Sequence, residues 1–160
     1  MVSFRTTLPA FLLLTCSLIT GSCDSRRFFE ENKSIAGGVW NTRDKLLFEV
    51  NIRDTVSLFN IFLNVRNSGD YPYSNLYFFI HTRFPAGKVT GDTMECQLAD
   101  YDGKWLGSGI GSVKFNRFLF QQGVRFRHPG TYVFEVEQAM REDPLKGIRD
   151  VGIRIEKQQS

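Results

Sequence analysis

The apolar residues of this chain recur with a period of two, the spacing of a β-strand that buries one face. In the clearest run, Phe48, Val50 and Ile52 alternate with Glu49 and Asn51. Similar runs occupy residues 59–65, 76–82, 94–98, 132–136 and 151–155, and weaker ones residues 113–120 and 124–126. No segment has the period of an amphipathic helix over about ten positions. The pattern predicts an all-β domain.

Turn signals separate these runs. Asp102 and Gly103 form a strong hairpin signal, and Pro129 and Gly130 introduce the run that follows them. About seven or eight strands at this spacing predict an antiparallel β-sandwich, either jelly-roll or immunoglobulin-like. We expect this single domain to occupy residues 36–160.

The first 22 residues do not fit the sandwich. Arg5 gives a positively charged start, an apolar stretch too short to span a bilayer follows, and small residues precede Cys23. This layout predicts a bacterial lipoprotein signal peptide over residues 1–22, with Cys23 as the acylated residue. Cys16 is a weaker candidate because bulky Leu14 and Thr15 precede it. An ordinary signal peptide with an incidental cysteine is the other interpretation.

A lipid on Cys23 makes the membrane the first expected partner. Each buried methylene contributes about 0.8 kcal/mol, so two or three acyl chains such as palmitate hold a domain almost permanently. We expect residues 23–35, which are mostly polar and charged, to be a short tether. Cys96 then has no partner for a disulfide, and its place among alternating apolar residues predicts a buried thiol.

Charge and candidate chemistry restrict the function further. The chain has 20 Lys and Arg against 17 Asp and Glu, which gives no electrostatic case for nucleic acid. We interpret the clusters at residues 26–27 and 125–128 as solvated edges or tether. His81 and His128 lie far apart in sequence, so a zinc site is not expected, and carboxylates such as Glu95 and Glu135 alternate with core positions. We predict no catalytic residues, no metal and no cofactor.

Four aromatic residues near turns form the candidate binding surface: Trp40, Tyr71, Tyr73 and Trp105. Exposed aromatics beside turns often contribute to binding surfaces. The competing interpretation is that these large side chains close the ends of the sandwich.

Three long stretches resemble the GldH gliding-motility lipoproteins of Bacteroidetes. They read RNSGDYPYSNLYFFIHTRFPAG (66–87), DTMECQLADYDGKWLGSGIGS (92–112) and GTYVFEVEQAMREDPLKGIRDVGIRIEK (130–157). The resemblance implies a lipid-anchored envelope protein needed for gliding, a process linked to type IX secretion. It also implies a location at the outer membrane, facing the periplasm, and carries over no catalytic residues.

Two functions remain open. The first is a non-enzymatic accessory of the motility and secretion apparatus that works through contacts with envelope proteins, and we favour it. The second is a binding module for glycan or another envelope ligand, which would use the aromatic loops.

Overall fold

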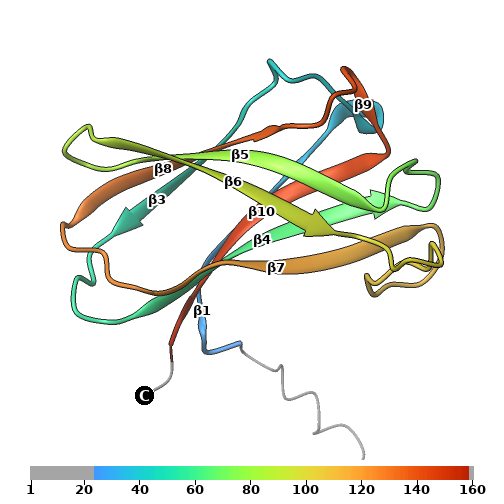
Figure 1. The fold of residues 1–160 in the computed structure, drawn as a ribbon. Helices are drawn as coiled ribbons and strands as arrows, with labels where there is room; N and C mark the ends of the chain where they lie inside the picture. The colour runs from blue at the N-terminus through green and yellow to red at the C-terminus, as the bar shows by residue number, and fades with distance from the viewer. Residues whose placement is uncertain (1–23, 159–160) are drawn as a thin grey trace, which may run out of the picture.

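The period-two runs form two four-stranded antiparallel sheets that pack face to face (Figure 1). The computed structural model describes residues 24–158. The first sheet has the order β1 (Arg27–Ser34), β10 (Ile148–Lys157), β4 (Phe59–Ser68) and β7 (Val113–Val124). The second has the order β3 (Leu46–Ile52), β8 (Gly130–Gln138), β5 (Asn75–Arg83) and β6 (Val89–Gln97). A 3-10 turn, η1 (Ala36–Gly38), precedes a small ribbon of β2 (Val39–Trp40) and β9 (Leu145–Lys146).

The strand pairing is nested. β5 pairs with β6, β4 with β7, β3 with β8, and β1 with β10, so the second half of the chain runs back along the first. Successive pairs alternate between the two sheets. This winding is that of an eight-stranded jelly roll, one of the ways in which an antiparallel double sheet is built. The predicted β-sandwich is confirmed, and the pairing selects the jelly roll over the immunoglobulin-like alternative.

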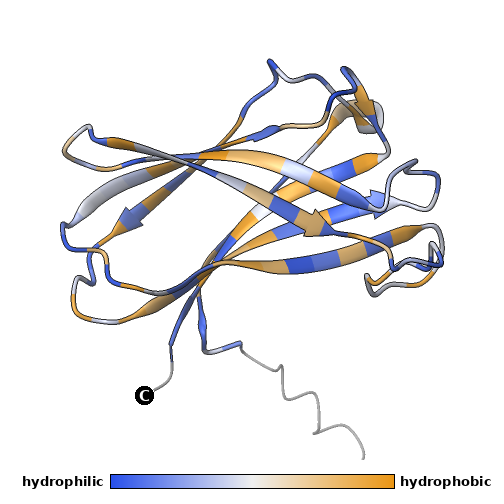
Figure 2. Cartoon of the chain, in the orientation of Figure 1, coloured by the Kyte–Doolittle hydropathy of each residue, from blue (hydrophilic) through white to orange (hydrophobic). Residues whose placement is uncertain are grey.

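The buried face of each strand supplies the core between the sheets. Figure 2 shows the alternation of apolar and polar residues along the strands. Phe48, Val50 and Ile52 are buried, as their spacing predicts, and Cys96 is a buried free thiol. Burial raises the pKa of that thiol to about 12, so it remains protonated and behaves as a small apolar side chain. Among the described residues, no helix has the length and hydropathy needed to span a membrane.

The predicted tether over residues 23–35 needs correction. Residues Arg27–Ser34 form β1, an edge strand paired with β10 along its whole length. Phe28 packs on the core, with its ring centroid 5.2 Å from that of Phe59. The sandwich therefore begins before residue 36. The predicted signal peptide and Cys23 lie outside the described residues.

The sequence of β1 is rich in charged residues because some of them belong to an ion-pair network on the outer face of the first sheet. The centre of this network is Arg154 on β10, which is only 3% exposed. Its Nη1 lies 2.6 Å from Glu30 Oε2, and its Nε lies 2.6 Å from Glu156 Oε1. Its Nη2 pairs with Asp24, the first described residue. The start of the domain is therefore held directly against β10.

These ion pairs predict that acid destabilises the protein. A hydrogen bond from Arg154 lowers the pKa of Asp24, and one from Lys157 lowers that of Asp54. Burial alone would raise the pKa of Glu30, but hydrogen bonds from Arg154 and Asn64 outweigh it and lower the pKa below its ordinary value of 4.5. Carboxylates with lowered folded-state pKa values stabilise the fold above their unfolded values and lose that contribution as the pH falls.

Thermal unfolding followed by circular dichroism should therefore give a melting temperature that falls as the pH drops from about 5 to about 3. Asp150 works in the opposite direction, because burial raises its pKa despite the ion pair with Arg66. Asp70 acts in the same direction as the first three, because a hydrogen bond from Ser68 lowers its pKa. A melting temperature that stays level or rises over this interval would show that the four carboxylates with lowered pKa values do not dominate.

Candidate functional site

Two of the four candidate aromatic residues lie inside the sandwich. Trp40 is 1% exposed, its ring centroid is 6.0 Å from that of Phe78, and its Nε1 donates a hydrogen bond to the carbonyl of Asp44. Tyr71 is 3% exposed, and its hydroxyl donates to the carbonyl of Asn75. Their burial fits the interpretation that these side chains close the sandwich, and it leaves them little surface for a ligand.

The other two aromatics lie beside Tyr71 at the same end of the sandwich. The Tyr73 ring centroid is 5.7 Å from that of Tyr71, and the Trp105 centroid is 6.5 Å from it. Tyr73 is 36% exposed and its hydroxyl bonds to Glu142, whereas Trp105 is half-buried. The structure thus brings three of the four residues together, but only Tyr73 and part of Trp105 reach the surface.

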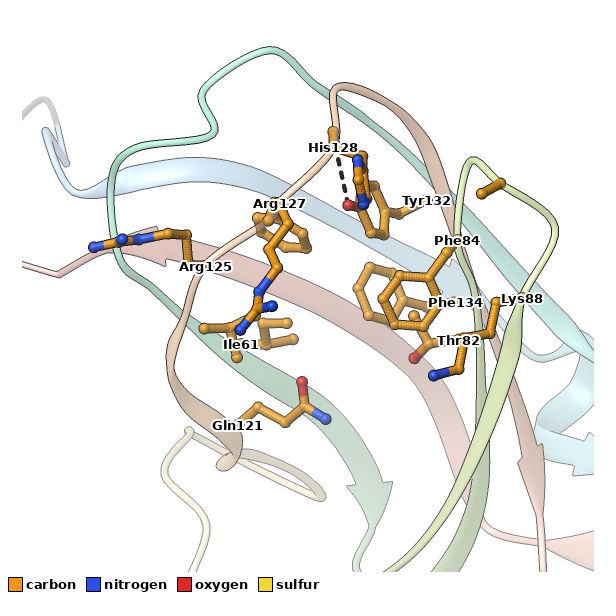
Figure 3. Close-up of a pocket in the computed structure, with 13 residues that line it drawn as sticks. Ile61, Thr82, Phe84, Lys88, Gln121, Arg125, Arg127, His128, Tyr132 and Phe134 are labelled. Carbon is orange, nitrogen blue, oxygen red and sulfur yellow. Dashed lines mark hydrogen bonds between the residues drawn. The ribbon is translucent and has the colours of Figure 1, made fainter.

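A cavity lies at the opposite end, between the two sheets (Figure 3). It has a volume of about 330 Å³, and its walls are mainly apolar. Phe84, Phe126, Tyr132, Phe134 and Ile61 supply these walls. We call it the end pocket.

Local sequence explains how the end pocket is shaped. Beyond the end of β7, Phe126 turns inward, with its ring centroid 4.8 Å from that of Tyr132 and 5.3 Å from that of Phe59. The Tyr132 hydroxyl donates to the carbonyl of His128, which holds the β7–β8 connection over the pocket (Figure 3). Gly130 follows with φ of 130°, and a Cβ there would lie 2.9 Å from Pro85 Cβ. The glycine therefore lets the β7–β8 connection pack against the β5–β6 turn.

Three cationic residues lie around the mouth of the end pocket, and the side chain of one of them, Arg125, points away from it (Figure 3). Lys88, Arg125 and Arg127 are exposed, and none of them forms an ion pair with another residue in the range 24–158. In Figure 3 Arg127 extends across the opening. An apolar cavity with unpaired cations at its mouth suits a ligand that has an apolar body and an anionic group.

The end pocket was not predicted from the sequence, which indicated solvated edges at residues 125–128. A signal was present, because Phe126 alternates with two arginines just before a Pro-Gly turn. That pattern places one aromatic inward and two cations outward, but it does not show which other segments complete the walls.

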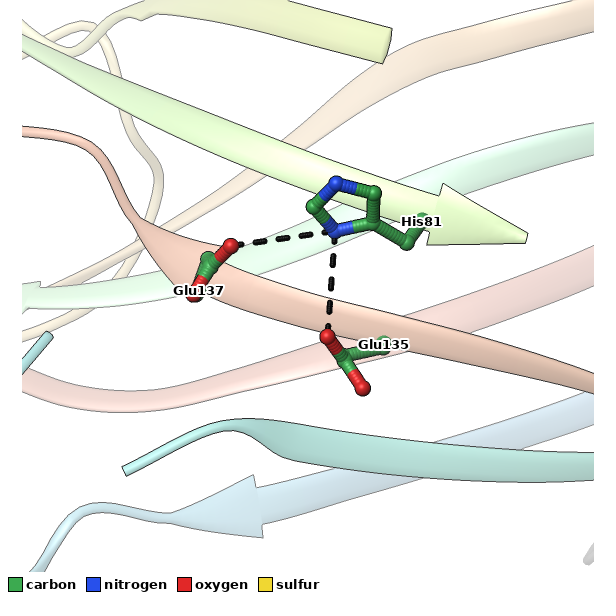
Figure 4. A group of neighbouring side chains, drawn as sticks. All are labelled: His81, Glu135 and Glu137. Carbon is green, nitrogen blue, oxygen red and sulfur yellow. Dashed lines mark ion pairs between the residues drawn. The ribbon is translucent and has the colours of Figure 1, made fainter. Parts of the chain in front are cut away.

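A second polar group lies on the outer face of the second sheet, away from the end pocket (Figure 4). His81 Nδ1 on β5 is 3.8 Å from Glu135 Oε1 and 3.7 Å from Glu137 Oε1 on β8. The three side chains offer ligand atoms within 4.8 Å of one another, which a metal ion could use. Lys45 Nζ, however, lies 2.6 Å from Glu135 Oε1 and 3.6 Å from Glu137 Oε2.

Lys45 therefore offsets one of the two carboxylate charges in this group. The hydrogen bond to Glu135 raises the pKa of Lys45, which keeps the ammonium charged. The ion pairs with Lys45 account for the two carboxylates as members of a surface ion-pair network, without a metal ion.

Together, the strand order and the end pocket define an eight-stranded jelly-roll domain with an apolar cavity at one end. The family follows from sequence: the model of the GldH lipoprotein family matches residues 27–155. The "Gliding motility lipoprotein GldH homolog" of Christiangramia forsetii is 36% identical over 160 residues, which cover 96% of this chain and 98% of that protein. The "Gliding motility lipoprotein GldH" of Flavobacterium johnsoniae is 34% identical over 152 residues, covering 91% and 94%. The chain belongs to the GldH lipoprotein family, as its three long stretches predicted.

Among solved structures, the chain is similar to dimeric latent PorU from Porphyromonas gingivalis. The TM-score is 0.36 at 8% identity, and the match covers 82% of this chain but 13% of that one. A likeness at this level carries no argument about function.

Proposed function

We propose that the protein is a lipid-anchored, non-enzymatic component of the cell envelope that supports gliding motility and the associated type IX secretion machinery through protein contacts. The observation that carries this proposal is family membership over nearly the whole chain. Two relatives that match end to end are named gliding motility lipoproteins. The matches cover 98% and 94% of those two relatives.

The anchor in this proposal is an acyl group on Cys23, at the outer membrane and facing the periplasm. Cys23 directly precedes Asp24, which Arg154 holds against β10. An acyl group at this position would keep the domain close to the lipid surface, because no long leash separates them. Confinement to one surface raises the effective concentration of the domain for partners in the same membrane.

Protein contacts are supported by apolar side chains at the end of the sandwich that carries Tyr73. The connection between β6 and β7 places Tyr101 and Ile110 fully in solvent, and Leu106 is 58% exposed. This connection is joined to the rest of that end by a hydrogen bond from the Gly69 amide to the Ser112 carbonyl. Exposed apolar groups clustered on a loop are typical of protein interaction sites.

Deleting the protein in its own bacterium tests this proposal. We expect slower spreading on agar and less type IX cargo in the medium, with both restored by the wild-type chain. Matched growth rates would exclude a general defect. Normal spreading together with normal secretion in the deletion strain would contradict the proposal.

A second candidate function is a ligand-binding module, which the end pocket favours. Its apolar walls and cationic mouth fit an amphiphile with an anionic group better than a glycan. Ala86 lines the mouth on the exposed β5–β6 turn, so Ala86→Trp should obstruct the opening without changing any charge.

We expect a fluorescent long-chain fatty acid to bind the wild-type domain and Ala86→Trp to weaken its binding by about tenfold, a cost of about 1.4 kcal/mol. Ala36→Trp, on the exposed η1 turn near the other end, adds the same side chain without changing any charge and serves as the control. Equal binding by both tryptophan variants would place the probe outside the end pocket.

A further inference from the structure

The end of the sandwich that contains the end pocket also carries an excess of unpaired positive charge. Five exposed cations belong to it: Arg26, Arg53, Lys88, Arg125 and Arg127. No ion pair within residues 24–158 involves any of them. The carboxylates of Asp24 and Asp54 lie at the same end, but they are already paired with Arg154 and Lys157. We call this surface the basic end.

Hydrogen bonds and shared hollows join the parts of the basic end. The amide of Lys157 donates to the carbonyl of Arg26, and that of Gln158 to the carbonyl of Leu58. A shallow hollow lined by Thr55, Leu58, Arg125 and Arg127 connects the β3–β4 loop to the β7–β8 connection. The first and last residues of the described range, 24–158, therefore lie at the same end of the molecule as the three connections (Figure 1).

Apolar side chains are exposed among these cations. Val56 is 78% exposed and Leu58 39% exposed on the β3–β4 loop, and Val89 is 53% exposed at the start of β6. Cations interspersed with exposed apolar groups match the boundary between lipid headgroups and acyl chains, where the charges meet anionic lipid and the apolar groups insert shallowly.

The opposite end has a different charge balance. Its loops and strand ends carry five exposed cations, Arg43, Lys104, Arg141, Lys146 and Arg149, but six carboxylates balance them, namely Asp44, Asp70, Asp100, Asp102, Glu142 and Asp143. No comparable excess of positive charge exists there. Positive charge is therefore concentrated at the end from which the chain leads back to Cys23.

We propose that the basic end is a membrane-docking face that rests on anionic lipid headgroups. Two observations favour anionic lipid as the partner of this face. Its positive charge complements lipid phosphates, and Asp24, the residue after Cys23, lies at this same end. Docking in this way orients the domain, with the end pocket towards the lipid and Tyr73, Tyr101 and Ile110 towards the periplasm. The orientation rests on the proposed anchor at Cys23, whereas the affinity of the face for lipid does not.

Vesicle flotation of a chain without the acyl group tests the face separately from the anchor. The chain from residue 23 with Cys23→Ala is suitable, since both sheets are complete within residues 24–158. We expect it to bind equimolar phosphatidylcholine and phosphatidylglycerol vesicles, to bind pure phosphatidylcholine far less, and to dissociate as salt is raised.

Arg125→Ala combined with Arg127→Ala should lower the partition coefficient on anionic vesicles by about tenfold or more. The matched control, Lys104→Ala with Arg141→Ala, removes the same charge from exposed sites at the opposite end and should bind as the parent does. Melting temperatures confirm that both variants fold. Equal losses in the two variants, or equal binding to neutral and anionic vesicles, would overturn the proposal. A failure of acylation at Cys23 would refute only the anchor.

Discussion

Replacing Cys23 with alanine should release the protein from the membrane fraction and abolish its labelling by an alkyne analogue of palmitate. Each acyl methylene buried in lipid contributes about 0.8 kcal/mol, so two or three chains outweigh any contact that the folded domain makes with a bilayer. Washing at high salt removes the remaining attraction of the basic end, because salt screens exposed charges. Under that wash we expect the wild type to stay with the membranes and Cys23→Ala to be nearly absent from them.

Cys16→Ala is the matched control for this prediction, since Cys16 is the other cysteine near the start of the chain. It should keep both the label and the membrane association. Label that survives in Cys23→Ala but disappears in Cys16→Ala would move the anchor to Cys16. Label that survives in both variants would contradict a thioester- or thioether-linked anchor at either position.

Replacing Arg154 with alanine should destabilise the fold by about 3–5 kcal/mol, the usual cost of removing one partner from a buried ion pair. Arg154 is 3% exposed and pairs with Asp24, Glu30 and Glu156. Its loss leaves Glu30 and Glu156 with only the longer ion pairs to Arg27 and Arg117. Urea unfolding followed by tryptophan fluorescence measures the change as a shift in midpoint at constant slope.

The control for Arg154 is Arg27→Ala, which removes an exposed arginine from the same carboxylate of Glu30. Exposed pairs contribute about 0–1 kcal/mol, so this variant should unfold near the wild-type midpoint. Arg154→Met with Glu30→Gln should recover part of the loss, because fewer uncompensated charges then remain. Similar effects of Arg154→Ala and Arg27→Ala would show that the buried network contributes little.

The strands could be predicted from sequence because their signal is local. Alternation places Phe48, Val50 and Ile52 on one face whatever the partner strand is, and all three are buried. The topology has no local signal, because β1 and β10 pair although they lie at opposite ends of the domain. For the same reason β1 was predicted to be a tether. The central charged side chain of β1, Glu30, is explained by Arg154 and Arg117, which are far away in sequence.

The candidate site shows the same limit. Trp40 and Tyr71 are aromatic residues near turns, as many surface aromatics are, yet the sandwich encloses them. The end pocket needs residues from β4, β5, β7 and β8 at once, so no single stretch of sequence indicates it. The family resemblance could be detected in the sequence because the residues that carry it form long contiguous stretches.

Site-specific photo-cross-linking in living cells tests most directly the claim that an anchored domain works through protein contacts. A photoreactive residue at Ile110 lies on the exposed loop that faces away from the basic end, and one at Val56 lies on the basic end itself. The account predicts that motility or secretion proteins of the envelope cross-link at position 110, that far fewer do so at position 56, and that the adducts at 110 fade with Cys23→Ala. Absence of envelope proteins from the adducts at 110 in the anchored chain would contradict it.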